Sequence, residues 1–356
     1  MIAERIDYAP RSYNKHCVIV PVTKEADEAA WLAERRHSVG SSGAAAALGL
    51  SPYSTTYAHW LEDVGLLEPE DISQKPAVKA GVKLESLVAE WYAEETGSRI
   101  ERVNGILRSK EHPFIHATLD RRIVGAESFL ECKTAGFWAG KSEEWGNSED
   151  RESDAVPMQY RIQVEVGMIV TGWQTSRLAV LIGGQDLRWF TCDRDPELDD
   201  MIVNGLDSYW NKVMQAREII ADARARGIAD PEKLIPKSLI PAPTDSSDLK
   251  LRYPRSIPKP IEATPEIVAL FDELLDARQA KAHADADVEE RKVAICDFMG
   301  ERDELTYNGD TLATWRMSKP RATFAADRHA KEQAACHELY AGVASAARPF
   351  NIKEPK

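Results

Sequence analysis

The segment HATLDRRIVGAESFLECKTAG, near the middle of the chain, constrains the fold more than any other part of the sequence. Both of its halves are short, apolar and rich in β-forming residues, and the stretch around Gly125 between them is typical of a hairpin turn. Side chains alternate along a strand, so Glu131 and Lys133 should share one face while Cys132 points to the other. The pattern predicts a strand that presents a carboxylate and an ammonium together.

Asp120 precedes this pair and adds a second carboxylate to the same region. Hydrolysis of a phosphodiester needs oxygen ligands for Mg²⁺ or Mn²⁺, an activated water and positive charge for the developing oxyanion. Asp120, Glu131 and the backbone carbonyl of Cys132 could hold the metal, and Lys133 could orient the water and stabilise the charge. The segment therefore predicts a metal-dependent phosphodiesterase site.

The acid-x-Lys spacing alone carries little weight, because a surface ion pair explains it better than a functional site does. The same spacing recurs at three other places in the chain, namely Glu290/Lys292, Asp248/Lys250 and Glu354/Lys356. These lie in an acidic helix, a Pro-rich stretch and the terminal tail. Only Glu131/Lys133 lies in an apolar strand with another acid just upstream, so context favours a functional site there.

An anion-binding turn is predicted in WLAERRHSVGSSGAAAALGL, which lies upstream of this segment. A helix carrying Trp31 and Arg35 leads into the Gly- and Ser-rich turn at 40–43, which opens an Ala-rich helix ending at Gly49. Free backbone N–H groups at a helix start, with glycines that allow close approach, suit a phosphate. A plain N-cap with a small-residue packing contact is the alternative.

A long amphipathic helix is predicted from about Pro76 to Gly97 by the spacing of its apolar residues. Glu85 lies within the apolar stretch of this helix. A carboxylate there is costly unless it meets a cation, which could be a metal ion or an arginine side chain.

A further helix carries Gln159 and Gln163, and two strands at 175–182 and 187–192 follow it, joined by a Gly-Gly turn. The two glutamines are one turn apart on one helix face, where their amides could hold water or phosphate oxygens. Glutamine pairs of this kind are also common on protein surfaces.

In this order, the motifs resemble the YqaJ-type viral recombinases, the lambda-exonuclease-like branch of the PD-(D/E)xK nuclease superfamily. The resemblance covers roughly residues 28–200. It rests on these motifs in order: W-x3-R, G-S-S, the helical glutamate, HPFI followed by AT and Asp120, ECKT, VP with its downstream Tyr and Gln, and LAVLIGGQD. It implies an α/β restriction-endonuclease-like core with a central mixed sheet flanked by helices. It also implies divalent-metal digestion of double-stranded DNA, from the 5′ end.

The resemblance implies catalytic roles for particular residues. Asp120 and Glu131 match the metal ligands, and Lys133 matches the catalytic lysine. Glu85 matches a helix carboxylate near the metal, and Gln159 matches a glutamine at the active site.

The resemblance also implies a binding site for a 5′-terminal phosphate. Arg35 and Ser42 match residues that bind this phosphate, and Thr118 occupies a position where a hydroxyl residue plays the same part. Gln163 is a further candidate for DNA binding, because it lies on the same helix face as Gln159. The implied partners are DNA ends, a single-strand annealing protein and further copies of the chain, with a ring around DNA as one arrangement.

Composition indicates a cytoplasmic protein. Mean hydropathy is −0.40, no apolar run is long enough to span a membrane, and the first ten residues lack the apolar core of a signal peptide. The five cysteines are scattered without C-x-x-C pairing, which argues against zinc, iron–sulfur clusters and structural disulfides.

The charge distribution reconciles an acidic chain with a DNA substrate. Net charge is −13, and residues 262–304 alone carry −8. A groove in the remainder could therefore be locally basic. Its candidate phosphate contacts, which could equally be ordinary surface cations, are Arg121, Arg122, Lys141 and Arg161.

The sequence predicts three parts: a nuclease core at 1–229, a Pro-rich connector at 230–265 and an acidic appendage at 266–356. Within the appendage we expect a charged helix at 265–299 and a hairpin across Asn308-Gly309, followed by a loose terminal tail. The appendage could be an assembly element or a cap on the core.

Two other functions fit parts of this sequence. An endonuclease or RecB-like repair nuclease on the same core would cut closed circular DNA, which an end-dependent exonuclease cannot do. A DNA-end-binding or assembly module without catalysis would need none of the catalytic set, so the presence of all its members argues against that function.

Overall fold

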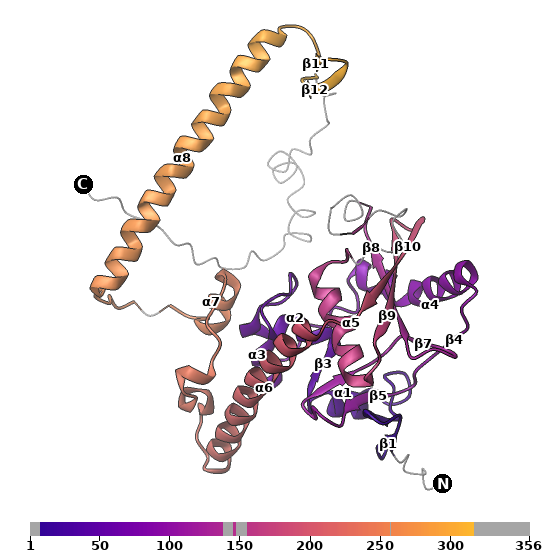
Figure 1. The fold of residues 1–356 in the computed structure, drawn as a ribbon. Coiled ribbons are helices and arrows are strands. Elements are labelled where there is room, and N and C mark those ends of the chain that lie inside the picture. Colours follow the sequence, from indigo (N-terminus) through magenta and orange to yellow (C-terminus); the bar gives the residue numbers. More distant parts are fainter. Residues whose placement is uncertain (1–7, 138–144, 147–154, 257, 317–356) are drawn as a thin grey trace, which may run out of the picture. The chain divides into compact units, whose positions relative to one another are not determined.

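The computed structural model describes residues 8–137, 145–146, 155–256 and 258–316. The chain divides into two compact units, Met1–Ile257 and Pro258–Lys356. The first unit has a mixed α/β architecture, with sheets flanked by helices (Figure 1). The fold class expected from the sequence is therefore confirmed.

The strands of the first unit form two mixed five-stranded sheets rather than one central sheet. The first sheet has the order β1 (Arg11–Ser12), β2 (Cys17–Val20), β5 (Ile106–Ser109), β6 (Ile115–Ala117) and β3 (Val39–Gly40). The second has the order β10 (Asp186–Asp193), β9 (Thr175–Ile182), β8 (Phe129–Ala135), β7 (Arg121–Ile123) and β4 (Ile100–Glu101). Two strand pairs are parallel, β3 with β6 and β8 with β9, and the other pairs are antiparallel.

The predicted hairpin around Gly125 forms, but its first strand differs from the expectation. Gly125 has a φ of +85°, which suits glycine, and the turn joins β7 to β8. The upstream half of the motif ends as β6 at Ala117 and pairs within the other sheet. The chain therefore passes from one sheet to the other between Ala117 and Arg121, and Asp120 lies in this crossing segment.

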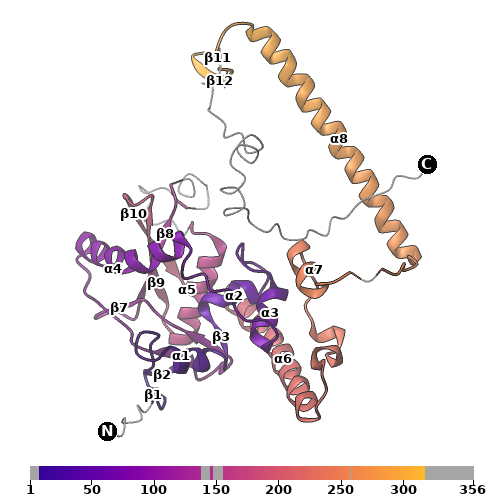
Figure 2. The same cartoon turned by 180° about the vertical axis from the view of Figure 1, so that it is seen from behind.

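Two helices cover opposite faces of the β8–β9 pair, α4 (Pro76–Thr96) and α5 (Met158–Thr171) (Figures 1 and 2). Both helices were predicted, and Gly97 ends α4 in the left-handed conformation. Leu130 and Cys132 pack with α4, whereas Phe129 belongs to the larger core that includes α5. The alternation expected along β8 is confirmed.

Helix α5 approaches β8 very closely at Gly167. A Cβ atom at this position would lie 2.5 Å from Cζ of the buried Phe129. No side chain fits at that distance, so glycine is required for this helix–sheet contact.

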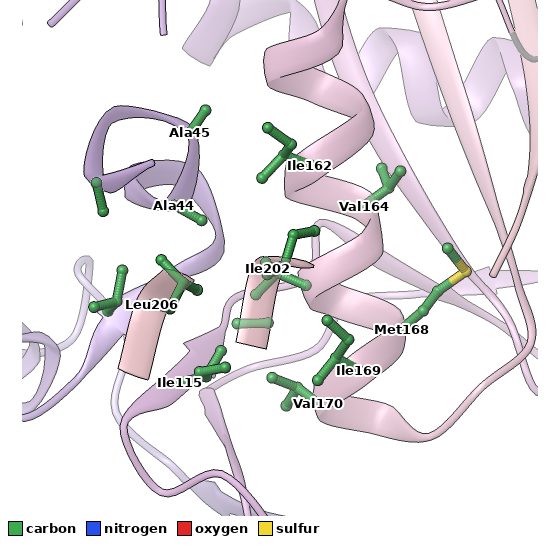
Figure 3. Packing of buried hydrophobic residues seen from close by; sticks show 14 of the residues in the cluster. Ala44, Ala45, Ile115, Ile162, Val164, Met168, Ile169, Val170, Ile202 and Leu206 are labelled. Atoms are coloured by element: carbon green, nitrogen blue, oxygen red, sulfur yellow. The ribbon is translucent and has the colours of Figure 1, made fainter. Parts of the chain in front are cut away.

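The main core lies between α5 and the helices α2 (Ser41–Ala47) and α6 (Pro196–Ala225). Figure 3 shows Ala44 of α2, Ile162 and Ile169 of α5, and Ile202 and Leu206 of α6 gathered in one cluster. The predicted Ala-rich helix is confirmed as α2, which fits here because its side chains are small. Helix α3 (Thr56–Val64) completes this side of the unit, whereas Ala30 and Trp31 of α1 (Glu28–Arg35) pack with Val20, Val22 and Ile106 in a separate cluster.

The Pro-rich stretch folds onto the first unit over much of its length. It forms η2 (Pro231–Leu234), η3 (Lys237–Leu239) and α7 (Ser246–Arg252). Ile235 joins the main core, and the buried Asp248 accepts hydrogen bonds from Thr55 Oγ1 at 2.5 Å and from the Thr244 N–H at 2.8 Å. We propose that the first unit's domain includes these residues and that the connector is correspondingly shorter.

In the second unit, α8 (Pro265–Met299) precedes a hairpin of β11 (Glu304–Tyr307) and β12 (Asp310–Thr314). Asn308 and Gly309 both have positive φ, at 51° and 93°, as a two-residue Asn-Gly turn requires. The predicted helix and hairpin are thus confirmed, whereas the expected terminal tail lies outside the described residues. None of the described helices is long and apolar enough to cross a membrane.

Candidate active site

Glu131, Lys133 and Gln163 form a compact hydrogen-bonded group on the α5 side of β8. The Lys133 ammonium donates to Glu131 Oε1 at 2.7 Å and to Gln163 Oε1 at 3.0 Å. The Gln163 amide donates in turn to Glu131 Oε1 at 2.6 Å. Glu131 is only 3% exposed, and a buried charge requires such partners. The group is therefore fixed in position.

Asp120 reaches the other edge of β8 from the crossing segment between the sheets. Its Oδ2 accepts a hydrogen bond of 2.8 Å from the Cys132 backbone N–H. Strand β7 pairs with β8 only as far as Leu130, so Asp120 takes the place of a neighbouring strand beyond that point. The N–H and C=O of one strand residue point to the same edge, so the Cys132 carbonyl lies on the Asp120 side.

The two carboxylates share one ammonium, and the pKa of Asp120 reflects this imbalance. Burial, and then the charge of Glu131, raise the pKa of Asp120 to about 8, although Lys133 and the Cys132 N–H act against the shift. Burial lowers the pKa of Lys133, but the charges of Glu131 and Asp120 outweigh it, and the net pKa is raised. A divalent cation would offset the excess negative charge.

The donors suit a hard cation, because Asp120, Glu131 and the Cys132 carbonyl all offer oxygen. Within the part of the chain that the structure describes, no three His, Cys, Asp or Glu side chains gather closely enough to hold a metal. The set that fits is therefore two carboxylates and a carbonyl, with the remaining positions left for water or substrate.

Glu85 of α4 forms an ion pair with an arginine. The sequence had left two partners open, a metal ion and an arginine. Glu85 Oε1 accepts a hydrogen bond of 2.8 Å from the buried Arg121, which also donates to the Asp120 carbonyl and to Ser86 Oγ. A pocket of about 250 Å³ opens beside this pair and is lined by Glu85, Asp120, Arg121, Thr118, Trp31, Lys24 and Arg102, among others. Glu85 thus lies at the site without joining Glu131.

Tyr160 of α5 lies close to the lysine. Its ring centroid is 5.1 Å from Lys133 Nζ, and its hydroxyl is 3.2 Å from that of Tyr53. Burial, and then the hydrogen bond with Tyr53, raise the pKa of Tyr160 to about 12, so the phenol stays protonated. Gln159 forms a side-chain hydrogen bond with Tyr160. Gln163 makes the contacts described above with Glu131 and Lys133.

The predicted phosphate residues Arg35 and Ser42 meet at the start of α2. Arg35 Nη2 donates to Ser42 Oγ at 3.2 Å, and the guanidinium lies 4.6 Å from the centre of the Trp31 ring. A Cβ at Gly40 would lie 2.7 Å from His116 Nε2 and 3.5 Å from Arg35 Nη2, so glycine keeps this turn open. The cluster is formed by residues from α1, α2 and β6.

His116 is a residue that the sequence reasoning missed. It is 1% exposed, its Nδ1 lies 2.9 Å from Ser38 Oγ, and its Nε2 has no hydrogen-bond partner among the described residues. Burial and the nearby Arg35 and Arg108 lower its pKa well below the usual value. The ring is therefore neutral and can donate from only one nitrogen at a time. Its only sequence signal was its place in the strand before Asp120.

Three of the predicted surface phosphate contacts are engaged in ion pairs. Arg121 pairs with Glu85, Arg122 with Glu101 and Arg161 with Glu165. Lys141 lies outside the described residues. Arg122 is a surface cation, which was the alternative to a phosphate-binding role, whereas the side chains of Arg121 and Arg161 are only 7% and 13% exposed and belong to buried ion pairs.

Comparison with known proteins shows what the region around the site is similar to. Residues 30–174 match the family model described as the YqaJ-like viral recombinase domain. This part of the chain is similar to that family. The expectation drawn from the order of the motifs is confirmed.

One relative and two solved structures illustrate the likeness. The uncharacterized protein YqaJ of Bacillus subtilis (strain 168) is 35% identical over 200 residues, which cover 56% of this chain and 60% of the relative. An alkaline exonuclease (LHK-Exo) from Laribacter hongkongensis is 18% identical with a TM-score of 0.47, covering 56% of this chain and 98% of that one. A phage related exonuclease from Haemophilus somnus 129PT is 14% identical with a TM-score of 0.36, covering 50% and 95%.

The matched region, residues 30–174, contains both clusters described above. The structure brings together Glu131, Lys133 and Gln163 in one group, with Asp120 on the neighbouring edge. Thr118 lies in the pocket wall with Trp31, on which Arg35 stacks.

Proposed function

We propose that this chain is a divalent-metal-dependent deoxyribonuclease that digests double-stranded DNA from its 5′ ends and leaves single strands for recombination. The observation that carries the proposal is the set of buried Glu131 and partly buried Asp120 and Lys133, in which two carboxylates compete for one ammonium. A purely structural ion pair would need one acid for one lysine. The excess acid is what a site for a metal ion requires.

The residues divide the work of hydrolysis among them. Asp120, Glu131 and the Cys132 carbonyl would hold Mg²⁺ or Mn²⁺, which when bound would lower the pKa of a water and offset charge on the phosphate. Lys133 would orient the attacking water and donate to the developing oxyanion. Gln163 would keep Glu131 and Lys133 in register, since it bonds both.

Glu85 and Gln159 would act from the sides of the site. Glu85 would hold Arg121 against the Asp120 carbonyl and so fix the crossing segment, and it would remain available to a second metal ion. Gln159 would position Tyr160 beside the lysine.

Arg35 and Ser42 would bind the terminal phosphate, with Thr118 in the adjoining pocket. A guanidinium forms paired hydrogen bonds with phosphate oxygens, and the Ser42 hydroxyl that it now contacts would add another donor. Burial lowers the pKa of Arg35, so the guanidinium is poorly solvated and would gain from a bound anion.

This chain spans 60% of the length of its curated relative, and the wider assembly is part of the proposal. We expect a single-strand annealing protein to receive the product strand, and we expect several copies of the nuclease to act together, in a ring or another closed form.

The decisive experiment measures digestion in Mg²⁺ or Mn²⁺ of one linear duplex, labelled separately at each 5′ and 3′ end, and of the same DNA as a closed circle. Stepwise release of label from 5′ ends with an intact circle is the expected result. Nicking of the circle would favour an endonuclease or RecB-like activity. Binding of ends without cleavage would favour an assembly module, and either outcome would overturn the proposal.

End recognition is tested by Arg35→Ala, with the neighbouring exposed Arg36→Ala as matched control. We expect R35A to lose roughly tenfold of the preference for 5′-phosphorylated over 5′-hydroxyl ends, because one charge-assisted phosphate contact disappears. R36A should keep the preference. Equal losses on both kinds of end in R35A would remove Arg35 from this role.

A further inference from the structure

Helix α8 presents large apolar side chains to solvent in its first and last thirds. Ile267, Leu270, Val288, Ile295 and Phe298 are between 44% and 77% exposed. Within the helix only Met299 is buried. Exposed apolar residues arranged in a row, rather than scattered singly, mark an interaction surface.

The row follows a seven-residue repeat, which we define as the α8 stripe. Its first positions are Ile267, Leu274, Lys281, Val288 and Ile295, and its fourth positions are Leu270, Ala277, Ala284, Arg291 and Phe298. A stripe with an average spacing of 3.5 residues is the pattern of a coiled-coil seam, not of a helix lying on a globular core. The stripe therefore fits another helix.

The charges that flank the stripe indicate what that helix is. Glu273 and Asp287 lie just before first positions, whereas Arg278 and Lys292 lie just after fourth positions. In a parallel pair of identical helices, each residue before a first position faces the residue five places later in the partner. Glu273 would then face the partner's Arg278, and Asp287 the partner's Lys292.

An antiparallel pair would bring like charges together. Glu273 would face Asp287 of the second copy, and Arg278 would face Lys292 of the second copy. Like charges at such positions are destabilising, so the flanking residues select the parallel arrangement. In the two arrangements compared, the flanking charges of α8 are complementary only in the parallel one.

We propose that α8 forms a parallel two-stranded coiled coil with α8 of a second copy of this chain. Lys281, the charged first position, lowers the affinity but favours a defined register, and the aliphatic stems of Lys281 and Arg291 cover the seam. The pairs Arg291–Asp287 and Lys292–Glu289 within one helix are all more than 60% exposed, so they are weak and can rearrange. The second unit would thus join two nuclease units.

The matched test compares Val288→Glu, in the stripe, with Val293→Glu, outside it. The two valines are on the same helix and are 64% and 57% exposed, so their effects on an isolated helix should be equal. We expect the full-length protein and V293E to show twice the mass of V288E in sedimentation equilibrium. A full-length protein with the same mass as V288E would overturn the proposal, whether α8 stays unpaired or packs against another segment of its own chain.

The orientation is tested by a charge exchange at Glu273 and Arg278. In the parallel pair, E273R places two like charges together and should weaken dimerisation several-fold, whereas the double variant E273R/R278E should restore it. In an antiparallel pair, E273R would instead meet Asp287 of the second copy and strengthen dimerisation. Tighter association of E273R would therefore overturn the parallel arrangement.

Discussion

The acid-x-Lys sequence occurs in both units, as Glu131/Lys133 in β8 and as Glu290/Lys292 in α8. In the strand the two side chains share a face, and Lys133 lies 2.7 Å from a glutamate that is almost fully buried. In the helix, residues two apart point in different directions, and Lys292 bonds Glu289 instead, where both side chains are more than 60% exposed. Secondary structure and burial, more than spacing, decide whether these residues can act together.

Asp248/Lys250 in α7 shows that an acid of this spacing can be buried without pairing with its lysine. Asp248 is fully buried, yet its carboxylate accepts hydrogen bonds from Thr55 and Thr244 and caps local structure. The β8 pair differs because a second carboxylate, Asp120, lies beside it without a cation of its own.

The largest expected effect is on catalysis. Lys133→Ala should reduce the rate of linear duplex digestion by about 100-fold or more, because a donor to the transition-state charge is lost from a buried site. Lys292→Ala, the same substitution in α8, should leave the rate within about twofold. The rates are measured on one labelled duplex with Mg²⁺ in excess. Similar rates for the two variants would break the distinction between the pairs and remove Lys133 from the mechanism.

A second effect concerns the pH dependence of stability without divalent ions. The pKa of Asp120 is about 8 in the folded protein and near 4 when unfolded, so folding retains a proton that the unfolded chain releases. The stabilisation is complete below about pH 4 and is lost as the pH rises to about 8.

Asp120→Asn abolishes this titration. At pH 8 the variant should be more stable than the original chain by at least about 1 kcal/mol, and the gain should shrink towards pH 4. Denaturant unfolding at several pH values gives the difference. Burial raises the pKa of Glu165 to about 7, but this residue titrates in both proteins, so its contribution cancels in the difference between their stabilities. A gain that stays constant with pH would contradict the assignment.

The smallest expected effect lies in α8. Glu290→Ala should change the free energy of unfolding by less than about 0.5 kcal/mol, because the residue is exposed and lies outside the α8 stripe. Denaturant titration of the full chain measures it. A loss above about 1 kcal/mol would mean that this pair is not an ordinary surface feature.

Local patterns predicted the elements well, because periodicity and turn residues act over a few positions. The helices at 76–96 and 265–299, the Gly125 turn and the β9–β10 hairpin all follow the sequence. The division into two sheets could not be predicted in this way, because it depends on the distant strands with which β6 and β7 pair.

The site shows the same limit. The sequence placed Gln159 and Gln163 on one helix face, but which of them meets Glu131 depends on how α5 is rotated on β8. The arginine partner of Glu85 was an open alternative, and only packing identifies it as Arg121. His116 carried no signal of its own, because its place beside Arg35 arises from the turn at Gly40.

The contact between Gly167 and Phe129 sets the distance between α5 and β8. Gly167 lies one helical turn beyond Gln163 on the same face of α5, so the thickness of residue 167 determines how far the helix stands off the sheet. A larger residue there would lift Gln163 from Glu131 and loosen the group around Lys133. Position 167 therefore sets the spacing of this group from behind, because only glycine lets α5 lie this close to β8.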